Sequence, residues 1–412
     1  MSGRGTRSRL TLAVTAASMS LVLAACSGDS TASPEPAEPP ASRGAANPDA
    51  PAEQEPPTSE AVISANVEKG ADDVAVDTAV AISVTKGTFD SVVVRDATHN
   101  QKVAGSLNEF DAKWTADDLL ESGTRYVVSA TATDSAGLVA KTRTRFSTED
   151  LSLDQQTYPN IIPLQGETVG VGMPVIVQFD IPVANRADFE RRMHVSASPS
   201  TVGSWHWMSD DEVHWRPKSY WHSGTEVDVH LDLNSVDAGN GIYGQVDRDV
   251  SFTVGRSVVM RADLDTLRMP VFVGGEHART LEITAGKQGF RTRSGTKLIM
   301  EKFESKRFDA ATVGIERGDP EYYNIPRVQY AQRLTFSGEF IHAAPWSVDD
   351  QGERNASHGC VGINTQDAAW LFGLTHRGDP MEVTGTVRRL EKGNGWTDWN
   401  QSFAEYKAGS AL

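Results

Sequence analysis

The sequence places one thiol beside two histidines. Cys360 ends the segment Ser357-His358-Gly359-Cys360, and His342 precedes it by eighteen residues in a strand-like run. A cysteine nucleophile is weak until a neighbouring base accepts its proton, and histidine is the usual base. The spacing therefore indicates acyl transfer through a covalent intermediate on Cys360.

The other cysteine, Cys26, belongs to an N-terminal segment with a different purpose. Three arginines within residues 1–9 precede an apolar run over 10–25 that ends in Leu-Ala-Ala-Cys26. This pattern predicts a secretory signal, and its ending resembles a bacterial lipobox, in which the cysteine is lipidated and becomes the first mature residue. The alternative is a signal peptide cut after small residues. In either case Cys360 is the single free thiol of an exported chain. Because a lone cysteine cannot form an internal disulfide, its presence indicates a reactive role.

Composition limits the partners of the chain. With 412 residues the chain is long enough for several domains. The net charge of -16 argues against nucleic acid and against a basic grip on anionic lipid. We therefore expect attachment to the extracytoplasmic face of the cell membrane through the lipid on Cys26. Residues 26–60, rich in Pro and Ala, would form a tether, reaching on the order of 100 Å.

Two blocks of alternating apolar residues follow the tether. Val80, Ile82 and Val84 alternate with small or polar residues, and the pattern recurs over residues 225–233. Period-two spacing cut by Gly, Asp and Asn turns predicts short antiparallel strands. Two units of about 100 residues each fit two immunoglobulin-like β-sandwiches without an internal cysteine pair.

Tryptophans and histidines are interleaved in the second block, between residues 205 and 222. Strand geometry puts Trp205 and Trp207 on one face and His206 on the other, and no zinc-ligand spacing is present. We favour core and interdomain packing for these tryptophans. A glycan-stacking surface and a metal site are the alternatives. The sequence predicts no cofactor and no metal.

From residue 256 onward the sequence pattern changes. Short strand-like runs precede Cys360, and the run 367–372 predicts a helix capped by Asn364 or Thr365. The nucleophile thus lies between strands and the start of a helix. Backbone N–H groups at such a position can face a developing oxyanion.

Residues 257 to about 385 resemble the catalytic domain of L,D-transpeptidases of the YkuD type. The signature of that family joins a histidine on a strand to Ser-His-Gly-Cys and an apolar residue, and here these are His342-Ala343-Ala344-Pro345-Trp346 and Ser357 to Val361. The order of lipobox, tether, sandwiches, catalytic domain and tryptophan-bearing tail is similar to the mycobacterial and other actinobacterial members. The expected fold is mainly β: two immunoglobulin-like β-sandwiches, then a β-rich YkuD-type domain with a short helix after the cysteine.

The resemblance implies an enzyme that forms 3-3 crosslinks between meso-diaminopimelate residues of peptidoglycan stem peptides. Cys360 would attack the donor tetrapeptide, release D-alanine and pass the acyl group to the amine of an acceptor stem. His342 would act as base, oriented by the backbone carbonyl of Ala343. Carbapenem β-lactams would acylate the same thiol.

The resemblance also assigns the neighbours of the thiol. The N–H groups of Gly359 and Cys360 would donate to the oxyanion, and Gly359 would allow close approach of substrate. His358 would either aid the oxyanion or hold the loop by a hydrogen bond, and both roles stay open. The residues expected to line the pocket or contact substrate are Tyr323, Ser337, Ser357, Trp346 and Ala343, with Tyr323 on a lid and Trp346 against the lid and the pocket wall.

Two positions depart from the family. Gly362 stands where many members have Arg or Asn, and Thr292-Arg293-Ser294-Gly295 replaces a Thr-Pro-x-Gly turn. Neither departure touches the nucleophile or the base. In the tail, Trp396 and Trp399 are expected to pack back onto the catalytic domain or the second sandwich.

Two other functions compete with crosslinking. A carboxypeptidase would use water as acceptor, and a non-catalytic cell-wall-binding lipoprotein would leave Cys360 and His342 unexplained. The predicted segments are a signal peptide (1–25), a lipidated tether (26–60), two immunoglobulin-like domains (61–149 and 150–255), the catalytic domain (256–385) and the tail (386–412).

Overall fold

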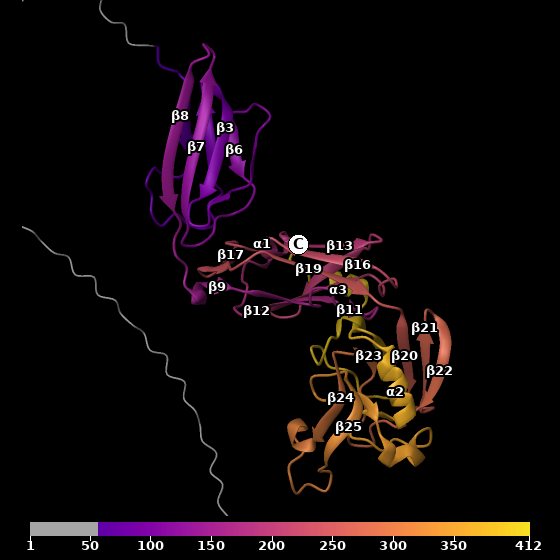
Figure 1. Cartoon of the computed structure of the whole chain (residues 1–412). Helices are drawn as coiled ribbons and strands as arrows, with labels where there is room; N and C mark the ends of the chain where they lie inside the picture. Colours follow the sequence, from indigo (N-terminus) through magenta and orange to yellow (C-terminus); the bar gives the residue numbers. More distant parts are fainter. Residues whose placement is uncertain (1–56) are drawn as a thin grey trace, which may run out of the picture. The chain divides into compact units, whose positions relative to one another are not determined.

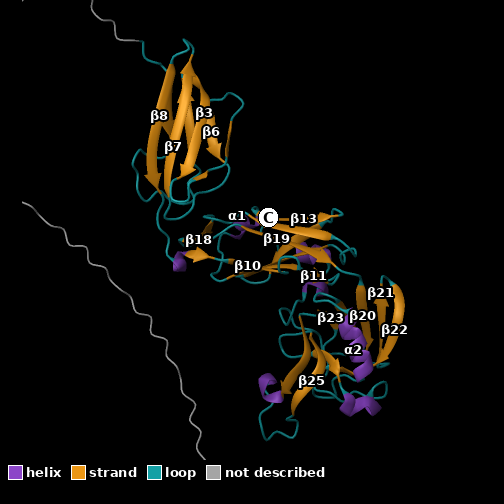
Figure 2. Cartoon of the chain, in the orientation of Figure 1, coloured by secondary structure: helices purple, strands orange, loops and turns teal. Residues whose placement is uncertain are grey.

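The computed structural model describes residues 57–412. The predicted signal peptide, Cys26 and nearly all of the tether lie outside the described residues. Strands dominate the described part, with a few short helices (Figure 2). The predicted fold class, two immunoglobulin-like sandwiches followed by a β-rich catalytic domain, is confirmed, whereas the domain limits stay a prediction. Within residues 57–412, none of the helices has the length and apolar character that a bilayer span requires.

The first sandwich consists of two four-stranded sheets. Its strands are β1 (Val62–Ala65), β2 (Ala81–Thr85), β3 (Gly87–Asp96), β4 (Gln101–Lys102), β5 (Gly105–Leu107), β6 (Lys113–Ala116), β7 (Arg125–Asp134) and β8 (Val139–Ser147). The sheets have the orders β1-β2-β6-β5 and β4-β3-β7-β8. Val80, Ile82 and Val84 are buried with Trp114 in one core, as their alternation predicts.

The second sandwich also has two four-stranded sheets, with a small third sheet beside them. Its elements are β9 (Gln156–Thr157), β10 (Pro159–Ile162), β11 (Thr168–Val169), β12 (Val175–Phe179), α1 (Arg186–Glu190), β13 (Met193–Ser198), β14 (Gly203–Trp207), β15 (Glu212–Pro217), β16 (Glu226–Leu231), β17 (Asp237–Gly239), β18 (Ile242–Gly244) and β19 (Arg248–Val254). The orders are β10-β12-β15-β14, β11-β19-β16-β13 and β17-β18-β9. Trp205, Trp207, Trp215 and Trp221 are buried in its core, which confirms the favoured packing role.

The catalytic domain is built on two further sheets (Figure 1). Its elements are β20 (Val258–Asp263), β21 (Arg268–Val273), β22 (Glu276–Glu282), β23 (Gly295–Leu298), β24 (Glu301–Asp309), β25 (Asn324–Arg333), β26 (Phe340–Ala343), β27 (Val361–Ile363), α2 (Thr365–Leu374) and β28 (Pro380–Thr384). The orders are β22-β21-β20-β28-β23 and β24-β25-β26-β27. Both sheets contribute to a common apolar core.

Helix α2 packs on β25 and β26 directly after the nucleophile strand. Asn364 is its N-cap, and the side chain accepts the Asp367 N–H at 2.9 Å. The helix ends before the chain enters β28. This settles the cap in favour of Asn364 and anchors the C-terminal end of β27.

The tail covers the outer face of the β14–β15 pair in the second sandwich. Trp399 Nε1 donates to the carbonyl of Gly172 at 2.7 Å. The buried Arg216 guanidinium lies 4.5 Å from the Trp399 ring centre and 4.3 Å from that of Tyr406, near α3 (Phe403–Lys407). Tail and sandwich therefore share a packed aromatic and cationic surface, as the two tail tryptophans predict.

Candidate functional site

The cysteine lies on a tightly held turn. Gly359 has φ +123°, a value that side-chain-bearing residues rarely adopt. The Ser357 hydroxyl accepts the Gly359 N–H at 3.1 Å and donates to the Cys360 carbonyl at 2.6 Å. On the other side, the Thr292 hydroxyl donates to the Gly359 carbonyl at 2.8 Å. These bonds fix the backbone that presents Cys360.

Sheet pairing brings the histidine to this turn. β26 runs parallel to β27, and His342 is in register with Gly362, two residues after the nucleophile. His342 Nδ1 donates to the carbonyl of Ala343 at 2.8 Å, the contact that the resemblance implies. With Nδ1 carrying the proton, the Nε2 lone pair is free to accept one.

Burial keeps both reacting groups neutral at rest. It lowers the pKa of His342 to about 4, against the small opposing effect of the Ala343 hydrogen bond. Burial also raises the pKa of the Cys360 thiol to about 12, and the thiol donates to the Gly338 carbonyl at 3.6 Å. The resting pair is therefore a thiol and a neutral imidazole, and proton transfer must accompany attack on substrate.

The thiol opens into a cavity of about 300 Å³. The cavity brings together most of the residues that the sequence proposed, with apolar walls around them. It is lined by Phe308, Tyr323, Ile325, His342, Trp346, Ala356, Ser357, His358 and Cys360. An acyl chain can enter beside the thiol while aromatic side chains restrict water.

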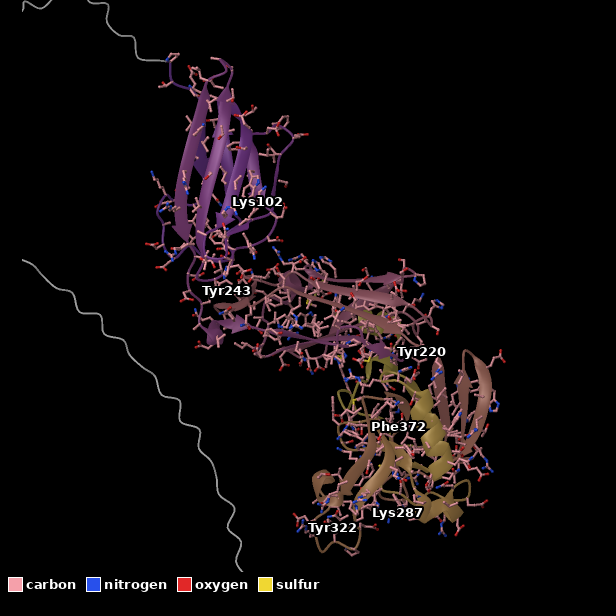
Figure 3. The ribbon with its side chains drawn as sticks, viewed as in Figure 1. Lys102, Tyr220, Tyr243, Lys287, Tyr322 and Phe372 are labelled. Carbon is pink, nitrogen blue, oxygen red and sulfur yellow. The ribbon has the colours of Figure 1, made fainter. Side chains whose placement is uncertain are left out.

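His358 contacts residues 310–323, the segment that ends at Tyr323 of the cavity lining and that we call the lid segment. Its Nε2 lies 2.8 Å from Glu321 Oε2, and the same carboxylate pairs with Lys287. The hydrogen bond from Lys287 first, then that from His358, lowers the pKa of Glu321. Lys287 and Tyr322 mark this end of the domain in Figure 3. This contact favours the loop-holding role of His358.

Aromatic residues form the rim. Tyr323 lines the cavity with its ring centre 4.9 Å from that of His358. The neighbouring Tyr322 does not line the cavity, and its hydroxyl donates to Asp309 at 3.1 Å. Trp346 stacks on His342 at 5.8 Å yet is 53% exposed. It therefore packs on the base at the cavity wall, as expected, while about half of the residue faces solvent.

Three sequence-derived expectations need revision. Ala343 is 1% exposed and does not line the cavity, so it contributes through the backbone carbonyl that holds His342. Ser337 does not line the cavity, because it turns to the tail, where its hydroxyl accepts Asn394 Nδ2 at 2.9 Å. The Gly359 N–H, expected to donate to an oxyanion, is occupied by Ser357. A periodic pattern reveals neither contact, because Ser337 meets a distant residue of the tail and the Ser357–Gly359 bond is a local feature of the turn.

Packing explains the glycine that departs from the family. A Cβ on Gly362 would lie 2.9 Å from Ala344 Cβ and 3.0 Å from Thr284 Cγ2. The backbone of Gly362 also exchanges two hydrogen bonds with Thr284, at 2.8 and 2.9 Å. A polar side chain would have to displace this contact, so the position has no room for the Arg or Asn of other members.

Sequence reasoning missed the charged residues around the site. Glu321 and Lys287 position His358, while Lys297 and Glu339 form a buried ion pair behind the nucleophile turn. The one signal was Arg293, which departs from the expected turn and also bonds Glu339. Nothing in the spacing of the other four indicated that they converge.

The chain is similar in sequence to known L,D-transpeptidases. A family model described as the L,D-transpeptidase catalytic domain matches residues 256–383, and one for a bacterial Ig domain matches residues 71–237. L,D-transpeptidase 2 of Mycobacterium tuberculosis is 33% identical over 84% of this chain and 84% of its own length. L,D-transpeptidase 5 of the same species is 29% identical over 95% of this chain and 82% of its length. A solved L,D-transpeptidase in complex with imipenem matches at 32% identity and a TM-score of 0.49, over 56% of this chain and 99% of that one.

Proposed function

The chain belongs to the L,D-transpeptidase family, and we propose that it forms 3-3 crosslinks in peptidoglycan through a thioester on Cys360. The observation that supports this assignment of residues is that Cys360 and His342 line the same cavity, with Nδ1 of His342 held by the Ala343 carbonyl. The geometry leaves a lone pair on the base and a thiol with room for an acyl group.

The first half of the reaction breaks the bond between diaminopimelate and the terminal D-alanine of a donor stem. The sulfur of Cys360 attacks the diaminopimelate carbonyl while its proton passes to His342 Nε2. The Cys360 N–H is the oxyanion donor that the resting structure favours, since the Gly359 N–H bonds Ser357. As the C–N bond breaks, His342 returns the proton to the amine of D-alanine, and a thioester remains.

The second half transfers the acyl group. The side-chain amine of an acceptor diaminopimelate attacks the thioester carbonyl, giving its proton to His342. The C–S bond breaks, and the leaving sulfur takes the proton back. The half-exposed rim at Trp346 and the lid tyrosine Tyr323 border the open side of the cavity from which an acceptor would arrive.

Carbapenems would enter the same chemistry as acyl donors. Their strained lactam carbonyl presents the electrophile that Cys360 attacks, and ring opening leaves the drug attached as a thioester. The apolar and aromatic cavity walls, including Phe308 and Tyr323, would receive the fused ring system.

We also propose that the protein is a lipoprotein on the extracytoplasmic face of the membrane. The support is the basic and apolar leader that ends at Leu-Ala-Ala-Cys26, followed by the Pro-rich stretch. A diacylated cysteine supplies the two chains that stable anchoring needs. The tether would let the folded part reach the cell wall.

Product analysis tests the crosslinking function. The protein without its leader is incubated with purified disaccharide tetrapeptide, and the products are read by mass spectrometry. A dimer that has lost one D-alanine supports crosslinking. Tripeptide alone would mean a carboxypeptidase, and unchanged substrate would mean a binding protein.

A further inference from the structure

A buried group of charges lies behind the nucleophile turn, outside the chemistry described above. Lys297 on β23 is 0% exposed and Glu339, just before β26, is 3% exposed. Their side chains form an ion pair, and the other oxygen of Glu339 accepts both the backbone N–H of Arg293 at 3.1 Å and its guanidinium at 3.0 Å. Burying charges costs desolvation free energy that pairing and hydrogen bonds must offset, so this cluster adds little net stability by itself.

Glu339 braces the two segments that hold the thiol. It follows Gly338, whose carbonyl accepts the Cys360 thiol, and its side chain ties Arg293 beside Thr292, which bonds the Gly359 carbonyl. A Cβ placed on Gly359 would lie 3.7 Å from Glu339 Cγ and Oε1. The carboxylate therefore lies directly behind the turn that presents the nucleophile.

A carboxylate at this place opposes the chemistry of its neighbour. The negative charge of Glu339 disfavours the thiolate of Cys360, and the positive charge of Lys297 favours it. The titratable and charged groups that face the thiol are Glu339 and His342 from the β26 segment, Lys297 from β23, Tyr323 from the lid segment and His358 from its own turn. Lys297 is the buried cation of this set.

We propose that Lys297 is a positioning residue that neutralises Glu339, so that Glu339 can brace the nucleophile turn without opposing ionisation of Cys360. Arg293 shares this task from the solvent side, where it also pairs with Glu391 of the tail. The proposal deepens the proposed function, since it rests on Cys360 being the nucleophile. It adds to the residues that support catalysis an ion pair, Lys297–Glu339, that does not contact the substrate.

The test compares how fast iodoacetamide alkylates Cys360 in the folded protein between pH 7 and 9. Lys297→Met removes the cation and leaves Glu339 paired with Arg293. At an effective dielectric of about 20, a unit charge about 12 Å away changes thiol ionisation by about tenfold, and a closer charge changes it more. We expect Lys297→Met to be alkylated about tenfold more slowly than wild type.

A charge-restoring variant separates electrostatics from structure. Lys297→Met/Glu339→Gln removes one charge of each sign, and it should react at least tenfold faster than Lys297→Met. If the ion pair only holds the turn together, the double variant will be as slow as the single one. Lys302→Met is the matched control, because Lys302 is a half-buried lysine of the same domain that donates to the Phe372 carbonyl at 2.7 Å, and its loss should leave the rate unchanged.

Each outcome bears on the proposal. A folded Lys297→Met with the wild-type rate overturns it, as does a folded double variant that is no faster than the single one. If Lys297→Met does not fold, the double variant decides: a rate within tenfold of wild type supports the proposal, and a larger loss overturns it. Alkylation needs no acyl acceptor, so failure here leaves the crosslinking function to be judged by its own products.

Discussion

A buried histidine and aspartate join the tail to the second sandwich, and their removal should change how stability depends on pH. His214 on β15 is 1% exposed, with Nδ1 at 2.8 Å from Asp398 and Nε2 at 3.0 Å from Glu212. Tyr406 donates to the same Asp398 oxygen at 2.9 Å. Because both ring nitrogens face carboxylates, the folded protein holds His214 as the imidazolium.

The magnitude follows from linkage. Burial alone would lower the pKa of His214, but the charge of Asp398, its hydrogen bond and those to Glu212 raise it from 6.5 to about 9. A folded-state pKa above the unfolded value means that the stabilisation is complete below pH 6.5 and is lost as pH rises through 9. A shift of this size corresponds to about 3 kcal/mol of unfolding free energy.

The matched variant is His214→Gln/Asp398→Asn, an uncharged amide pair that keeps the hydrogen-bonding positions. Urea unfolding followed by tryptophan fluorescence reports the sandwich and tail, because the tryptophans concentrate there. From pH 6 to 9.5 the wild-type midpoint should fall by on the order of 1–2 M more than that of the variant. If the urea midpoints of the two proteins change in parallel with pH, the claim that His214 is held as the imidazolium is refuted.

Four further predictions concern the base, the glycine of β27 and the anchor. Because burial keeps His342 neutral down to a pKa of about 4, carbapenem acylation should lose rate near pH 4, and a loss centred on 6.5 would contradict this. His342→Ala should slow acylation by roughly 10²–10⁴-fold, with the residual rate rising toward alkaline pH. Gly362→Asn should destabilise the protein by about 1–3 kcal/mol through its clash with Ala344, as seen in thermal unfolding. Cys26→Ser should release the full-length protein from membranes without altering soluble turnover, and a variant that remains membrane-bound would exclude lipid anchoring.

The sequence pattern predicted the strands correctly where only one face of the strand is buried. Alternation at Val80, Ile82 and Val84 predicted strands with one face in a core, and these side chains are buried there. In β14 the same rule was incomplete, because Trp205 and Trp207 fill the core while His206 is buried by Tyr406 of the tail on the other face. Period two cannot tell a solvent face from one that a distant segment covers.

The site residues likewise divide into those that a local motif predicts and those that depend on distant segments. Cys360 and His342 were predictable because a short motif and a strand place them, and the resemblance implied the Ala343 contact. Ser337 was misplaced, because its partner Asn394 lies more than fifty residues later in the tail. The Lys297–Glu339 pair was invisible for a similar reason, since β23 and β26 belong to different sheets.

The central claim is that Cys360 carries the acyl group, and intact-mass spectrometry tests it most directly. The wild-type protein and Cys360→Ala are each incubated with a carbapenem, and separately with disaccharide tetrapeptide. Near-ultraviolet circular dichroism checks that the variant keeps its packing. We predict one drug mass added to the wild type, none added to the variant, and no crosslinked product from the variant. A folded Cys360→Ala protein that still gains the drug mass or still makes dimer would contradict the account.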